Sequence, residues 1–109
     1  SAKMAIATAS SEGVVVSSFV RDSLERLLQL LPDDLPYVEP YISTAGSLCL
    51  DWDDNPGFQF SVMLQGSGRV AYAAFFGGER MHGSSDFSRV SLPQGALVAA
   101  SRWIECAGS

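Results

Sequence analysis

The sequence has few charged residues, one histidine, two cysteines and no long apolar run. Charged residues make up 17% of its 109 residues and apolar residues 47%, which is the composition of a folded domain and not of a disordered chain. This length predicts one domain with a single core. No apolar run approaches the roughly 20 residues that a membrane-spanning helix needs. We therefore expect no membrane association.

The cysteines and the histidine give no sign of a metal site or a catalytic site. Cys49 and Cys106 lack the short spacing of a zinc or redox motif. Because no signal peptide is visible, we expect two reduced thiols in the cytoplasm of a host cell, with a disulfide as the alternative. His82 lies within "MHGSSD", where residues so close along the chain seldom form a catalytic triad. The glycines of "GSGR" and "FFGGER" lack a phosphate-loop lysine, so they indicate hairpin turns and no cofactor is expected.

The net charge of −5 is concentrated in one segment. From Asp33 to Asp54 the chain has six acidic residues and no Lys or Arg, so this segment carries −6, and the other six acidic and seven basic residues sum to +1. A nucleic-acid backbone would be repelled by such a segment, whereas a basic protein surface would be attracted. The charge pattern therefore predicts a protein partner and no direct contact with nucleic acid.

The hydrophobic period changes twice along the chain. It is helical near the start, alternates in the middle, and is helical again near the end. A helix is predicted that Ser17 or Ser18 can cap and that Pro32 ends, because proline disfavours the helical conformation in the residue before it. The prolines of residues 32–40 indicate an extended connector. The later predicted elements are strands at 47–53, 58–64 and 70–76, a short strand at 80–84, and a helix over 91–105 whose buried stripe includes Leu97.

These elements predict an α+β fold. An N-terminal helix, a three- or four-stranded antiparallel β-meander and a C-terminal helix would form one domain over residues 13–109, with the helices on one sheet face. Residues 1–12 are expected to be a flexible N-terminus, with a cloning remnant before Met4. Trp52 is expected in the core, although a register slip of one residue would place it outside.

The stretch "DWDDNPG" has three interpretations. As a calcium loop, Asp51, Asp53 and Asn55 fit the first ligand positions, but Pro56 and Val62 stand where a glycine and a bidentate glutamate are needed. We therefore expect no metal site. As an acid–base pair, Asp51 and Asp53 would lie roughly 6.5 to 7 Å apart on one strand face. The third interpretation is a hairpin turn with solvated aspartates, and it is preferred.

"PYISTAGSLCLDW" and "FSVMLQGSGRVAY" resemble a scattered group of small bacterial and phage proteins. The shared features are a proline, a turn, a strand ending in an acidic residue and Trp, and a hairpin before a Val-x-Tyr strand. Such proteins look like products of mobile elements, and small acidic proteins of that origin resemble anti-CRISPR inhibitors, which occlude basic nucleic-acid-binding surfaces. The resemblance carries over no catalytic residue. It implies a partner such as a CRISPR effector subunit.

The sequence therefore predicts a non-enzymatic, acidic protein-binding inhibitor of the anti-CRISPR type. An antitoxin or immunity protein is one alternative, and a metal- or small-molecule-dependent enzyme using Asp51 and Asp53 is another. An alternative interface is the sheet edge near Arg80 to Gly83. The predicted partner-binding residues are Asp33, Asp34, Tyr37, Glu39, Tyr41, Asp51, Asp53 and Asp54.

Overall fold

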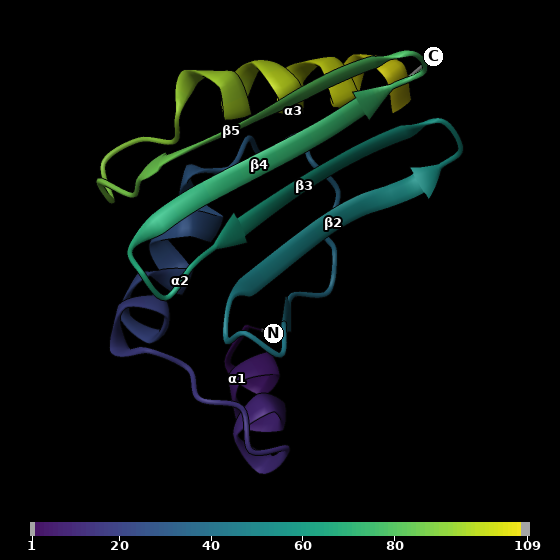
Figure 1. Cartoon of the computed structure of the whole chain (residues 1–109). Helices are drawn as coiled ribbons and strands as arrows, with labels where there is room; N and C mark the ends of the chain where they lie inside the picture. The colour runs from purple at the N-terminus through teal and green to yellow at the C-terminus, as the bar shows by residue number, and fades with distance from the viewer. Residues whose placement is uncertain (1, 108–109) are drawn as a thin grey trace.

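The computed structural model describes residues 2–107, and the side chains of all of these except 2, 3, 54, 55 and 107. The elements in chain order are α1 (Ala2–Ser11), α2 (Ser18–Leu30), β1 (Tyr41–Ile42), β2 (Leu48–Asn55), β3 (Phe58–Leu64), β4 (Arg69–Phe76), β5 (Glu79–Asp86) and α3 (Gln94–Ala107). The strands form one antiparallel sheet in the order β1-β2-β3-β4-β5. The predicted α+β class, with a C-terminal helix packed on the sheet, is confirmed. In Figure 1, α3 lies toward the β5 edge of the sheet and α1 toward the β2 end.

The sheet has five strands where the sequence predicted three or four. The additional strand, β1, is only two residues long and follows Pro40. Two residues are too few to show an alternating pattern, so the sequence did not predict this strand. The strand expected to be short, β5, extends over eight residues. Its full length was not predicted, because its glycine and serines give little hydrophobic alternation.

Helix α1 was not expected from the sequence either. Its ten residues include four alanines, which favour helix intrinsically. Ile6 and Ala9 are buried in the main apolar cluster. Packing of these two side chains, and not a strong hydrophobic period, accounts for the helix.

Local signals fixed the ends of α2. The Ser17 side chain accepts a hydrogen bond from the Val20 backbone N–H, as the predicted cap requires. At the other end, Leu31 is extended at φ −70° and ψ 146°, as a residue before proline should be.

Alternate strand residues form a helix-covered face of the sheet. Leu48, Leu50 and Trp52 are all buried, so the predicted strand register and the core position of Trp52 are confirmed. The other buried residues of this face are Phe60, Val62, Leu64, Val70, Ala74 and Phe76. Helix α2 contributes Val20, Leu24 and Leu27 to the same cluster. The opposite side of the sheet is called the open face below.

Helix α3 meets the sheet through small residues. Ala96, Ala99, Ala100 and Trp103 are buried, whereas Leu97 is 36% exposed, so its predicted place in the buried stripe was wrong. The Pro93 carbonyl accepts bonds from the backbone N–H groups of Ala96 and Leu97. The helix therefore starts at Gln94 and not at Ser91, and three alanines let it approach the strands closely.

Candidate functional site

The acidic segment lies along the β1–β2 edge of the sheet. The indole N–H of Trp52 donates a 2.9 Å hydrogen bond to the carbonyl oxygen of Pro36, which fixes the connector beside β2. Tyr41 and Ile42 then pair with Cys49 and Leu48. We call the eight predicted partner-binding residues on this connector, β1 and β2 the acidic edge.

Tyr41 and Asp51 are joined across two strands of the acidic edge. Tyr41 lies opposite Cys49, so its ring reaches diagonally to the next residue on the open face, and Tyr41 Oη donates to Asp51 Oδ2 at 2.7 Å. This bond is the main reason why the pKa of Tyr41 is raised well above its ordinary value of 10.0. A bond from a hydroxyl to a carboxylate is charge-assisted and holds both groups in place.

A second tyrosine and acid are paired in the connector. Tyr37 Oη donates to Glu39 Oε2 at 3.0 Å, and this bond is the first cause of a raised Tyr37 pKa. The Tyr37 side chain is 74% exposed and that of Tyr41 47% exposed. Two aromatic rings are thus presented to solvent, each oriented by a neighbouring carboxylate.

Most of the predicted partner-binding residues are accessible where the structure describes them. Asp51 is half-buried. The side chain of Asp54 lies outside the described residues. The exposed members are Asp33, Asp34, Tyr37, Glu39, Tyr41 and Asp53.

The acids are divided between the two sides of the sheet edge. Asp33 lies on the helix-covered side, where it lines a cavity together with Leu50 and Trp52. Asp51 lies on the open face, beneath Tyr41. The regular pairing of β2 with β3 breaks between Trp52 and Asn55, which places Asp53 and Asp54 in an irregular segment.

An apolar cavity of about 470 Å³ adjoins the acidic edge. It lies between the end of α2, the connector and β2. Apolar side chains in its wall are Leu28, Leu31, Leu35, Val38, Leu50 and Trp52. The cavity was not predicted from the sequence, because the prolines of the connector indicated only an extended segment. The signal that could have found it is the pair of apolar residues, Leu35 and Val38, that alternate with these prolines.

Cys49 is buried, although it lies on the open face of the sheet beside Asp51. It is only 3% exposed because it lies in register with Tyr41 on one side and Met63 on the other. This burial is the main cause of its raised thiol pKa. Cys49 and Cys106 are both free thiols.

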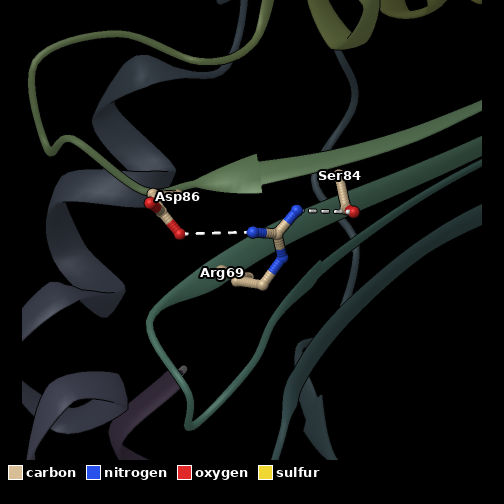
Figure 2. A network of polar contacts seen from close by, with 3 residues as sticks. All are labelled: Arg69, Ser84 and Asp86. Atoms are coloured by element: carbon tan, nitrogen blue, oxygen red, sulfur yellow. Dashed lines mark hydrogen bonds and ion pairs between the residues drawn. The ribbon is translucent and has the colours of Figure 1, made fainter.

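His82 and its neighbours lie at the other edge of the sheet, on β5. His82 is exposed and borders a hollow of about 390 Å³ on the open face, together with Gln59, Ser61 and Phe75. Ser84 lies two positions away, and its hydroxyl accepts a 3.1 Å bond from Arg69 Nη2 (Figure 2).

Among the described residues, no three His, Cys, Asp or Glu side chains are grouped so that they could hold a metal ion. In residues 2–107 no helix is both long enough and apolar enough to cross a membrane.

Comparisons of the chain with protein-family models, with curated proteins and with solved structures gave no match.

Proposed function

We propose that this protein is a non-enzymatic binding module whose acidic edge contacts a basic surface of a protein partner. The observation that carries the proposal is the association of three features at one sheet edge. These are the segment of charge −6, the exposed and oriented rings of Tyr37 and Tyr41, and an apolar cavity next to them.

The electrostatic part of the proposal selects the kind of partner. Exposed carboxylates such as Asp33, Asp34 and Asp53 attract Lys and Arg and repel phosphate. Complementary charge of this kind speeds association and excludes wrong partners more than it adds affinity. A protein surface that normally holds nucleic acid offers the matching positive potential.

The apolar part supplies the affinity that charge alone does not. Binding energy at protein interfaces is concentrated in a few aromatic or apolar anchors that are surrounded by polar residues. Tyr37 is well placed as such an anchor, because it lies both in the wall of the cavity and beside Glu39. A partner that inserts an apolar side chain next to a Lys or Arg would satisfy both features.

Occlusion of a basic nucleic-acid-binding surface is the inhibition expected of such a module, in the manner of anti-CRISPR inhibitors. A CRISPR effector subunit is therefore the first class of partner to test. An antitoxin or immunity protein would use the same edge against a toxin. The identity of the captured partner distinguishes these two cases.

The test is capture from a host lysate with identification by mass spectrometry, using two variants of equal charge. The first is Asp51→Asn, Asp53→Asn and Asp54→Asn. The matched control removes three acids elsewhere: Asp22→Asn, Glu25→Gln and Glu105→Gln. We expect the first variant to lose the partner and the control to retain it, and we expect the captured protein to lose its nucleic acid when wild type binds. If both variants capture the partner as well as wild type does, the acidic edge is only a solubility feature.

A further inference from the structure

The two edges of the sheet are protected very differently. At one edge β1 has two residues, and the connector beside it contains Pro36 and Pro40, which cannot donate backbone hydrogen bonds. At the other edge β5 has eight residues and no proline, and it is the last strand in the sheet order. A long edge strand without such protection is a template for pairing with another strand.

The hydrogen bonds in the sheet show which β5 residues face outward. Gln65 N–H donates to Arg69 O and Gly77 N–H to Gly57 O, each at 2.8 Å, so odd-numbered β4 residues bond to β3. Even-numbered β4 residues therefore bond to β5, as the 2.9 Å bond from Phe87 N–H to Gly68 O also indicates.

The register between β4 and β5 also shows which β5 residues direct their backbone groups toward β4. The odd-numbered residues of β5 lie opposite even-numbered β4 residues and bond to them. The backbone N–H and C=O groups of Arg80, His82, Ser84 and Asp86 are consequently directed toward the free edge.

We propose that the partner of this edge is a second copy of the same chain, paired antiparallel through β5 about a two-fold axis at Gly83. In this register Arg80 lies opposite Asp86 of the second copy, and His82 lies opposite its Ser84. Each of these residues has its backbone groups directed outward, so the opposing residues can exchange both hydrogen bonds. At the axis, Gly83 of one chain lies opposite Gly83 of the other, and neither has a side chain that obstructs the approach of the two strands.

Charge selects this register over its neighbours. A shift of the axis to His82 places Arg80 opposite Ser84, and a shift to Ser84 places it opposite Ser88, so both shifts lose the ionic pairing. The chosen register forms the pair twice by symmetry, and opposite charges directly across a strand pair are stabilising.

The side chains of Arg80 and Asp86 are exposed enough to form these pairs. The Asp86 side chain is 92% exposed, and its contact with Arg69 is long, at 3.3 Å (Figure 2). It can accept a second cation on its remaining lone pairs. The Arg80 guanidinium lies 5.7 Å from the centre of the Phe75 ring, exposed on the open face.

Such a dimer would have one continuous sheet with an acidic edge at each end. The sheet order places β1 and β5 on opposite edges, so self-association leaves both acidic edges uncovered. Two identical sites on one particle increase the apparent affinity for a repeated or dimeric target. The dimer does not depend on the proposed function, since it uses different residues.

Sedimentation velocity on the full chain, at concentrations up to about 1 mM, tests the pairing. We expect wild type to dimerise, and Arg80→Asp and Asp86→Arg each to weaken dimerisation about tenfold or more, since each places like charges opposite each other twice. An equimolar mixture of the two variants should restore the dimer, because both ionic pairs then form between unlike chains. Ser84→Pro, which removes an outward N–H, should also yield monomers.

Thermal melting checks that each variant is folded. Wild type that stays monomeric would overturn the proposal, as would dimers that persist in both charge variants. Failure of the mixture to form dimers would refute the register. The pull-down with the acidic-edge variants is independent of these outcomes.

Discussion

The Trp52 indole N–H and the Pro36 carbonyl oxygen lie 2.9 Å apart and form the hydrogen bond that holds the connector against β2. Trp52 is 3% exposed and stacks on Phe60, with ring centroids 5.3 Å apart. The bond therefore links the core of the sheet to a segment that carries half of the acidic edge. Loss of this bond should lower the free energy of unfolding and should also let the connector shift relative to β2.

Substitution of Trp52 by Phe measures this link, with Trp103→Phe as the matched control. Both tryptophans are buried, but Trp103 Nε1 has no hydrogen-bond partner among the described residues. Both substitutions remove the same atoms, and Trp52→Phe also leaves the Pro36 carbonyl without its donor. We expect Trp52→Phe to lower the free energy of unfolding by about 1 kcal/mol more than Trp103→Phe does. Urea denaturation gives both values, and equal losses would contradict the assigned role of the bond.

Tyr72 occupies the space that side chains at Gly83 and Gly95 would need. A Cβ at position 95 would overlap Tyr72 Oη and lie 2.6 Å from its Cζ, and one at position 83 would lie 2.8 Å from Oη. Gly→Ala in a helix usually stabilises by roughly 0.5–1 kcal/mol, but we expect Gly95→Ala to destabilise by about 1–3 kcal/mol through overpacking. In a Tyr72→Ala background the same substitution should become stabilising.

Gly78→Ala is the control for this prediction. Nothing lies within 4 Å of a Cβ built at Gly78, so the change should stay within about 0.5 kcal/mol. Thermal or urea denaturation of the four variants completes the comparison. If Gly95→Ala destabilises equally with and without the Tyr72 ring, the cause lies in the first turn of α3 and not in this contact.

Local patterns in the sequence predicted the helices α2 and α3 and the main strands. A strand alternates its side chains strictly, so the buried face of β2 followed from Leu48, Leu50 and Trp52 alone. The cap of α2 followed equally from Ser17 and Pro32. These features depend on residues that are neighbours along the chain.

The missed features depend on contacts between distant residues. Helix α1 exists because Ile6 and Ala9 find apolar neighbours, and β1 because a two-residue segment pairs with β2. For the site, clustering of acids along the chain identified the segment. It did not predict the bond between Tyr41 and Asp51, which depends on the β1–β2 register, or the cavity, which needs α2 and the connector together.

Ionisation of Tyr41 should reveal its bond to Asp51. Because the folded-state pKa lies above the ordinary value of 10.0, the folded protein holds the proton more tightly than the unfolded chain does. The stabilisation is complete below about pH 10 and is lost as the pH rises further toward the folded pKa. A spectrophotometric titration should therefore show a tyrosine that ionises at a higher pH in wild type than in Asp51→Asn. Asp53→Asn removes the same charge but leaves the bond intact, and an equal effect of both variants would assign the shift to general charge.

The carboxylates and the tyrosines of the acidic edge should affect different rate constants once the partner is captured. Steering by exposed charges is screened over about 8 Å at physiological ionic strength, so the association rate constant should fall as salt rises. The variant with Asn at Asp51, Asp53 and Asp54 should show a slower association rate and a shallower salt dependence. Its melting temperature should fall only modestly, because exposed charges contribute little to stability and the loss comes mainly from the bond between Tyr41 and Asp51. Tyr37→Ala removes an exposed ring from the cavity wall and should mainly accelerate dissociation. Surface plasmon resonance at several salt concentrations separates the two constants. An association rate that is independent of salt, or a Tyr37→Ala variant that dissociates as slowly as wild type, would show that the partner binds a different surface.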